Sequence, residues 1–227
     1  MATTTRPGPS LLSALPGRLA TDLFTGAKPV GLAADETLFL AGDPGDGCYR
    51  VEDGLLKVSM VSRSGTERIL AFLGSGAIVG ELSMIDGRPR SATVVAVRKA
   101  ALRFLSHTAF ESFARKNPEV YKSLVTLLAS RLRETDTVVA AGSFLPLKGR
   151  VASTLLDLAE NFGQDVGSGR IVIRQKIAQS DIAAMAGIAR ENVSRILNDW
   201  KRRKLVSRLS GYYCLENKSQ LEHEAEL

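Results

Sequence analysis

One stretch of the chain combines side-chain types that together recognise a phosphorylated sugar. Glu81 follows Gly80 directly, and a compact polar segment leads from there to Arg90-Ser91-Ala92. A guanidinium group beside a hydroxyl and free backbone N–H groups suits a phosphate, and a carboxylate, which only accepts hydrogen bonds, suits a sugar hydroxyl. The pattern predicts a pocket for a ribose joined to a phosphate. The alternative is a β-turn in which Arg90 is a solvated surface charge.

Short strands are expected to position this stretch, which we interpret as a polar turn between strands at 77–79 and 93–97. Segments rich in Gly, Asp and Pro, such as Asp53-Gly54, separate the strands as turns. Short strands at this density indicate an antiparallel barrel or roll. The further strands are expected at 36–40, 48–52, 55–61, 68–72 and 101–105.

A long helix should follow the roll, after a short helix over 106–114. Asn117-Pro118 is a helix start signal, and the pattern stays helical to about Ala141. A second apolar face, Leu124 and Leu127, is expected to pack back on the roll. One stripe of residues on this helix is spaced by alternating steps of three and four residues, as in a coiled-coil seam. It predicts a parallel homodimer; the alternative is core packing within one domain. The stripe consists of Val125, Leu128, Leu132, Thr135, Val139 and Gly142.

The helical pattern breaks at 145–149, which we interpret as a hinge and domain boundary. An amphipathic segment at 150–159 follows it, then a loop at 163–169 and a strand at 171–173. Near the end, 205–207 and 212–215 predict a hairpin, and the acidic tail from Glu216 is expected to be frayed.

A helix closed by glycine at 179–187 precedes a second helix that begins at Arg190. Their apolar residues face one another, so the pair predicts a helix-turn-helix with Gly187 at the turn. This leaves polar residues exposed at positions that enter the major groove in this motif, where arginine reads guanine and glutamate accepts from cytosine. The alternative, a solvated face with ion pairs, does not account for the preceding helix and glycine turn. The exposed residues are Arg190, Glu191, Ser194 and Arg195.

Composition sets the limits of these interpretations. The 227 residues carry a formal net charge of +6, which favours an acidic partner, nucleic acid first. Two cysteines and two histidines provide little for an iron–sulfur cluster or a haem, so no prosthetic group is expected. No apolar run approaches the ~20 residues that span a bilayer, and residues 1–10 are interpreted as a disordered leader. We therefore expect a cytoplasmic protein.

The two polar constellations carry a resemblance to a known family. Gly80-Glu81-Leu82 with Arg90-Ser91-Ala92-Thr93 resembles the phosphate-binding cassette of cyclic-nucleotide-binding domains. Arg190-Glu191-x-x-Ser194-Arg195 resembles the recognition helix of the CRP/FNR family of bacterial transcription regulators, in its cAMP-receptor-like (CAP-like) branch. The resemblance implies an α+β chain with a cyclic-nucleotide-binding β-roll of jelly-roll topology at 1–116, a dimerisation helix at 117–144 and a winged helix-turn-helix at 145–227.

Roles for individual residues follow from the same resemblance. Glu81 would bind the ribose, Arg90 and Ser91 the cyclic phosphate, and Thr135 stands where the family has its base-contacting threonine. Asp136 replaces a serine that reaches the nucleotide of the opposite subunit. A carboxylate accepts from adenine's amine or twice from guanine's edge, so cAMP and cGMP both stay open; alternatively Asp136 points to solvent or pairs with a neighbour. The implied cofactor-binding residues are Gly80, Glu81, Leu82, Arg90, Ser91, Ala92, Thr135 and Asp136.

The implied function is a cyclic-nucleotide-responsive transcription regulator that binds palindromic TGTGA-like DNA as a homodimer. RNA polymerase is then a further partner, and no membrane is involved. Lys201 and the basic residues after it would contact the phosphate backbone, or would simply be solvated. The cAMP-responsive branch has a glycine at the position of Ser194, whereas a serine there resembles the FNR branch. The base read at this position of the DNA site therefore stays open.

Three rival functions differ in class. The first is a regulator that is constitutive or senses another small molecule. The second is a regulatory module of an enzyme, as in cyclic-nucleotide-dependent kinases, against which the winged C-terminal half argues. An enzyme proper is the third, and no nucleophile–base constellation or metal cluster supports it.

Overall fold

The computed structural model describes residues 17–226, so the leader at 1–10 lies outside the described residues. The chain divides into two compact units, which meet within one long helix between Arg133 and Glu134. Each unit is described separately below. The three domain limits expected from the sequence stay a prediction.

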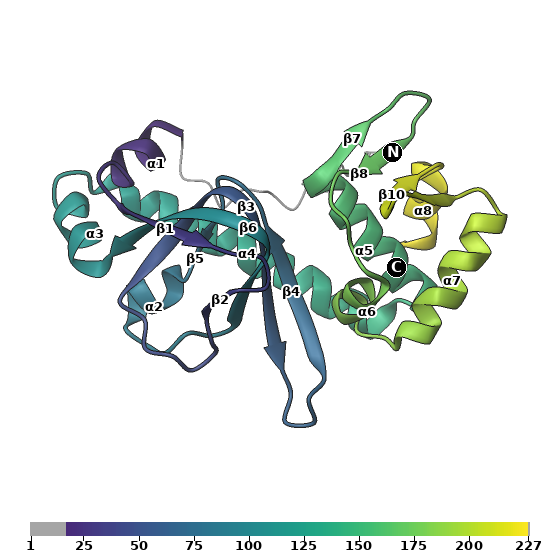
Figure 1. Cartoon of the computed structure of the whole chain (residues 1–227), viewed down its shortest axis with the longest axis horizontal. Helices are drawn as coiled ribbons and strands as arrows, with labels where there is room; N and C mark the ends of the chain where they lie inside the picture. Colours follow the sequence, from purple (N-terminus) through teal and green to yellow (C-terminus); the bar gives the residue numbers. More distant parts are fainter. Residues whose placement is uncertain (1–16, 227) are drawn as a thin grey trace. The chain divides into compact units, whose positions relative to one another are not determined.

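An antiparallel six-stranded sheet forms the roll of the N-terminal unit (Figure 1). Strand order is β1-β6-β3-β4, with β2 paired to β6 and β5 paired to β3. Two long strands, β3 with 15 residues and β6 with 14, form the centre of the roll, and the other strands are short. The strands are β1 (Lys28–Leu32), β2 (Thr37–Phe39), β3 (Gly47–Val61), β4 (Glu67–Leu73), β5 (Ile78–Val79) and β6 (Thr93–Ser106).

The turn predicted at Asp53-Gly54 is wrong. Strand β3 continues through it, and its pairing with β6 shifts register between Val51 and Leu56. Gly54 has φ +116°, and a Cβ there would lie 2.4 Å from that of Ala100. The glycine therefore makes a β-bulge possible where a turn was expected. In the same way, the two strand segments expected at the start and end of β6 are one strand.

Four helices accompany the roll: α1 (Gly17–Leu23), α2 (Glu81–Asp86), α3 (His107–Ala114) and α4 (Glu119–Phe144). The Ser106 side chain caps α3 by accepting from the Ala109 N–H. Leu124 of α4 is buried in one apolar cluster with residues of α1, α3 and the roll, and Leu127 is buried too. The predicted packing of this helix face on the roll is confirmed. A second cluster, around Val51, Leu56 and Leu102, fills the roll itself.

Helices α5 (Leu147–Phe162), α6 (Gln179–Ala186), α7 (Arg190–Arg202) and α8 (Lys218–Glu224) belong to the C-terminal unit. Its four-stranded antiparallel sheet has the order β7-β8-β10-β9. The strands are β7 (Gly163–Asp165), β8 (Ile171–Ile173), β9 (Val206–Leu209) and β10 (Tyr212–Leu215). The predicted C-terminal hairpin is β9–β10, whereas β7 occupies part of the segment that was expected to be a loop.

The C-terminal tail and the helices differ in how they compare with the sequence-based predictions. The frayed tail is wrong: α8 is a helix, and its Leu221 is fully buried. Leu221 is the one buried residue of this otherwise polar helix, and Ala225 directly after it is buried as well. Among residues 17–226, no helix is long and apolar enough to cross a membrane.

Candidate functional site

Helix α2 occupies the segment expected to be a plain turn. Gly80 precedes it with φ +82°, and Gly87 ends it with φ +67°. A Cβ on Gly80 would lie 2.4 Å from Nη1 of Arg90. Both the backbone conformation and the close guanidinium therefore require glycine at position 80.

Arg90 points into the roll, with only 5% of its surface exposed. Its Nη1 donates to the carbonyl oxygens of Gly47 and Gly80, each at 2.8 Å, and its Cζ lies 4.4 Å from the centre of the Phe39 ring. The alternative of a solvated surface charge is wrong. Nε of Arg90 is buried and has no hydrogen-bond partner among the described residues.

Glu81 is the most deeply buried charged residue of the cassette, at 1% exposure. Its Oε1 accepts from Nη1 of Arg131 on α4, whose Nη2 donates to the carbonyl oxygen of Ile78. Oε2 is buried without a partner among residues 17–226. Buried carboxylate oxygens are normally satisfied, so this atom is the clearest mark of a ligand position.

Arg131 was missed by sequence reasoning, although the sequence contains a signal for it. It follows Val120, Leu124 and Leu127 at steps of four, three and four, on the face of α4 that packs on the roll. An arginine on a buried face requires an anionic partner there. Glu81 is the carboxylate that the fold supplies.

The rest of the cassette differs in exposure. Ala92 is buried, while Leu82 and Ser91 are exposed. A Cβ on Gly45 would lie 2.4 Å from Cβ of Ser83 and 2.9 Å from Cζ of Arg90. The loop before β3 thus closes tightly over the cassette, which the sequence did not indicate.

Cys48 lies in the same apolar cluster as Met84 of α2. Burial, and then the charge of Glu81, raises the pKa of its thiol to about 12, against the opposing charge of Arg90. The thiol therefore stays neutral near pH 7. It belongs to the core beneath the cassette.

Thr135 and Asp136 are exposed on the part of α4 that belongs to the C-terminal unit. Their predicted contacts with a nucleotide base stay a prediction. Three apolar members of the predicted seam, Val125, Leu132 and Val139, are exposed on the same helix, and Leu128 is half-buried.

Helices α6 and α7 form the predicted helix-turn-helix. Asp181 stabilises the start of α6 by accepting from the backbone N–H of Ala178 at 3.2 Å. Gly187 ends it in the left-handed region, with φ +66°. Ile182 of α6 and Val193 of α7 are fully buried, as expected for helices that pack through their apolar faces.

The predicted DNA-reading residues share one side of α7. Arg190, Glu191 and Arg195 are exposed, and Ser194 is half-buried. Arg195 donates to Oδ1 of Asn192. Asn198, Lys201 and Arg202 continue the exposed side at steps of three and four, and Asn198 was not singled out from the sequence.

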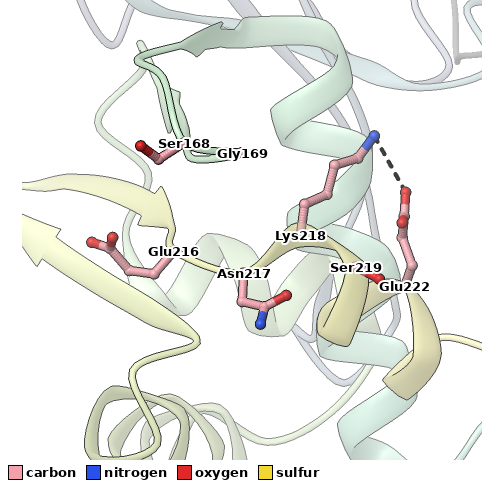
Figure 2. A pocket seen from close by; sticks show the side chains of 7 residues that line it. All are labelled: Ser168, Gly169, Glu216, Asn217, Lys218, Ser219 and Glu222. Carbon is pink, nitrogen blue, oxygen red and sulfur yellow. Dashed lines mark ion pairs between the residues drawn. The ribbon is translucent and has the colours of Figure 1, made fainter.

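A hollow of about 440 Å³ lies elsewhere in the C-terminal unit, between the turn after β7 and the start of α8 (Figure 2). Its charged side chains already have partners: Glu222 pairs with Lys218 at 3.2 Å, and Glu216 with Arg170 at 3.9 Å. It presents no unsatisfied buried group, so we assign no ligand to it.

Sequence comparisons agree with this geometry. Residues 29–117 match the cyclic nucleotide-binding domain, and residues 149–224 match the Crp-like helix-turn-helix domain. A CRP-like cAMP-activated global transcriptional regulator of Mycobacterium tuberculosis is 32% identical over 218 residues, which is 96% of this chain and 90% of that protein. The chain belongs to the CRP/FNR family of transcription regulators.

Other members of the CRP/FNR family support the assignment. The cyclic AMP receptor protein of Thermus thermophilus is 37% identical over 71% of both chains. A solved CRP/FNR-family regulator from Thermus thermophilus has a TM-score of 0.72 at 26% identity, covering 88% of this chain and 99% of that one. FixK2 from Bradyrhizobium japonicum has a TM-score of 0.77 at 20% identity, covering 88% and 98%, and shows the shared fold.

Proposed function

We propose that this chain is a cAMP-responsive transcription regulator that acts in the cytoplasm as a homodimer on palindromic TGTGA-like DNA, with cGMP as the competing ligand. RNA polymerase is a further partner in this proposal. Membership of the CRP/FNR family, with both its domains present, supports the class of function. The ligand and the response to it are argued from Glu81, Arg90 and Arg131.

The observation that carries the ligand assignment is the pair of unsatisfied buried atoms in the cassette. Oε2 of Glu81 is an acceptor and Nε of Arg90 is a donor, and neither has a partner among the described residues. A ribose hydroxyl and a phosphate oxygen supply the complementary groups. Relatives named as cAMP-activated support our choice of cAMP as the first candidate, and Asp136 keeps cGMP in consideration.

Arg131 connects the proposed ligand site to the long helix α4. Glu81 is held by Arg131, so a ribose hydroxyl that bonds to Glu81 changes the environment of a helix that also carries the exposed seam residues. The ligand shifts the conformational equilibrium only by its differential affinity for the two states. A homodimer would bury the seam and set the spacing of two recognition helices.

A titration on DNA tests the proposal. The protein is added to a fluorescent duplex with a TGTGA-type palindrome in buffer alone, with cAMP and with cGMP, at fixed salt. We expect tight binding only with cAMP; stronger binding with cGMP would reassign the ligand and implicate Asp136. The absence of binding under all three conditions would contradict the DNA assignment.

A second candidate is a CRP/FNR-type regulator that is constitutive or responds to another effector. The fold itself accommodates other ligands, since the regulator CLP of Xanthomonas campestris, described as c-di-GMP responsive, has a TM-score of 0.76 at 19% identity. Equal DNA binding with and without cyclic nucleotide would favour this candidate. Arg90→Gln should then leave DNA binding unaltered.

A further inference from the structure

The C-terminal helix α8 is packed tightly against the start of α5. Leu221 and Ala225 are buried, and a Cβ on Gly149 would lie 2.9 Å from the carbonyl oxygen of Glu224. Only glycine allows this approach without a shift of the backbone. The first turn of α5 is thus a fixed surface against which α8 is held.

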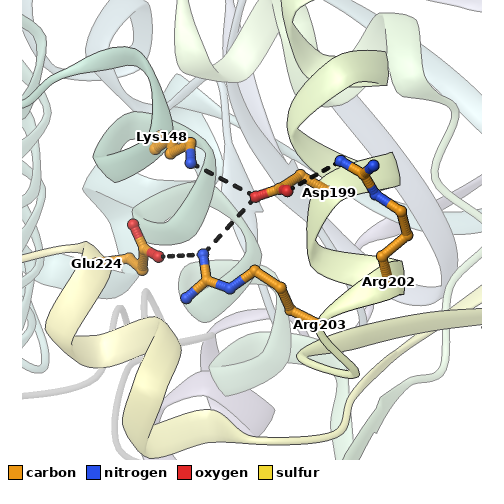
Figure 3. A network of polar contacts seen from close by, with 5 residues as sticks. All are labelled: Lys148, Asp199, Arg202, Arg203 and Glu224. Carbon is orange, nitrogen blue, oxygen red and sulfur yellow. Dashed lines mark hydrogen bonds and ion pairs between the residues drawn. The ribbon is translucent and has the colours of Figure 1, made fainter.

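A charge cluster connects these two helices to the recognition helix α7 (Figure 3). We define it as Lys148 on α5, Asp199 on α7, Arg203 directly after α7, and Glu224 on α8. Nη1 of Arg203 lies 3.0 Å from Oε1 of Glu224 and 3.7 Å from Oδ2 of Asp199. The same Oδ2 lies 3.5 Å from Nζ of Lys148. The cluster therefore joins α8, the end of α7 and the first turn of α5.

The titration of Asp199 is consistent with these contacts. Desolvation raises the pKa of its carboxyl, but Lys148, Arg202 and Arg203 together bring the pKa below its usual value. Arg202 and Lys201 lie on the exposed side of α7 with the DNA-reading residues. Arg203 is turned away from them into the cluster. Both Arg202 and Arg203 pair with Asp199, but only Arg203 also pairs with Glu224 of α8.

We propose that Arg203 and Glu224 are positioning residues for DNA recognition: they hold the end of α7 against α8, which packs on α5, and so fix the recognition helix in its reading orientation, without touching DNA. The inference rests on the proposed function, since it assumes that α7 reads base edges. Reading of bases requires an exact helix orientation, whereas non-specific binding depends on phosphate charges and tolerates reorientation. Loss of the cluster should therefore reduce specificity more than general affinity.

The test compares Glu224→Gln with Glu222→Gln in the full chain. Both replace a carboxylate of α8, but Glu222 pairs with Lys218 of its own helix instead of α7. Affinity is measured with cAMP for a TGTGA palindrome and for an unrelated duplex, over a range of salt. We expect Glu224→Gln to lose about tenfold in the ratio of specific to non-specific affinity, and Glu222→Gln to retain it.

Arg203→Met distinguishes positioning from phosphate contact. For a positioning role it should lower the specificity ratio like Glu224→Gln, with an unchanged salt slope, and the double variant should be no worse than either single variant. Equal weakening on both duplexes with a salt slope reduced by about one would make Arg203 a phosphate contact and would overturn the inference. Wild-type specificity in Glu224→Gln would overturn it too.

An additional measurement separates this inference from the proposed function. If the wild-type chain does not prefer the palindrome, the proposed function fails, and amide hydrogen exchange then decides the positioning. The Arg203 N–H donates to the Asp199 carbonyl oxygen at 3.0 Å. Faster exchange at the end of α7 in Glu224→Gln than in Glu222→Gln supports the positioning role, and equal exchange contradicts it.

Discussion

The guanidinium of Arg131 and the carboxylate of Glu81 form an ion pair that joins the long helix α4 to the cassette helix α2. The carboxylate is almost fully buried, and only one of its oxygens is satisfied. A buried charge depends strongly on its partner. The pair therefore links the stability of the roll to the group that we assign to the ribose.

Arg131→Met should destabilise the N-terminal unit by about 3 kcal/mol, because it leaves the Glu81 carboxylate buried without a counter-charge. Urea unfolding of the full chain measures the change. The double variant with Glu81→Gln should recover part of this loss, since it removes the unpaired charge. A single variant as stable as the wild type would show that the pair contributes nothing.

Arg90→Gln should weaken binding of cAMP by about 10- to 100-fold, the loss of charge-assisted hydrogen bonds to a phosphate. Calorimetric titration measures the affinity. Arg88→Gln is the matched control, because Arg88 is two residues away and its side chain is 84% exposed. If both variants bind like the wild type, Arg90 does not hold the phosphate.

Gly45→Ala should impair the cassette through a collision alone, since the φ of Gly45 lies outside the left-handed region that favours glycine. The added Cβ would collide with Ser83 and with the Arg90 guanidinium, so the loop or Arg90 must move. We expect at least about tenfold weaker cAMP binding. Gly31→Ala is the control, because no atom lies within 4 Å of its added Cβ; equal effects of the two substitutions would contradict the predicted collision.

The Cys48 thiol should make the stability of the N-terminal unit sensitive to alkali. Its pKa is raised on folding from 9.0 to about 12, so its contribution is complete below pH 9 and is lost as the pH rises toward the folded pKa. The slope is about 1.4 kcal/mol per pH unit. Urea unfolding at about pH 8 and about pH 10 should show this fall in the wild type and a smaller one in Cys48→Ala; parallel falls would exclude Cys48 as the cause.

If the chain is the homodimer that we propose, Leu132→Glu should convert it to monomer, because it places a charge in the predicted apolar seam of α4. Val61→Glu is the control on β3, since Val61 is 61% exposed in the chain and Leu132 63%. Sedimentation velocity measures the mass. A dimer that persists in Leu132→Glu would move the interface away from this seam.

Local sequence signals predicted much of this architecture. Strand β5 before Gly80, the start of α4 near Pro118 and the glycine end of α6 all depend on residues close to them in the chain. Residue type, and a spacing that resembles a known cassette, predicted Glu81 and Arg90 as ligand-binding residues. The same local patterns predicted the helix-turn-helix and the side of α7 that carries Arg190 and Arg195.

The errors have a common cause, which is dependence on distant residues. The local sequence at Gly54 predicts a turn, but the pairing of β3 with β6 makes it a β-bulge. The local sequence of the tail predicts fraying, but Leu221 is buried where α8 packs on α5. For Arg203 a phosphate contact stays a prediction, but the local pattern of the basic run does not reveal its ion-pair partner Glu224. In each case the partner lies too far along the chain for a local pattern to include it.

The sequence by itself predicted which groups would recognise a ligand and DNA, because hydrogen-bonding chemistry is a property of the side chain. Tertiary structure decided how those groups are held. It buried Glu81 and Arg90, left one atom of each unsatisfied, and supplied Arg131 from another helix. Charge pairing arises only when distant segments exclude water together, so the helical spacing of Arg131 indicates its face of α4 but does not identify Glu81 as its partner.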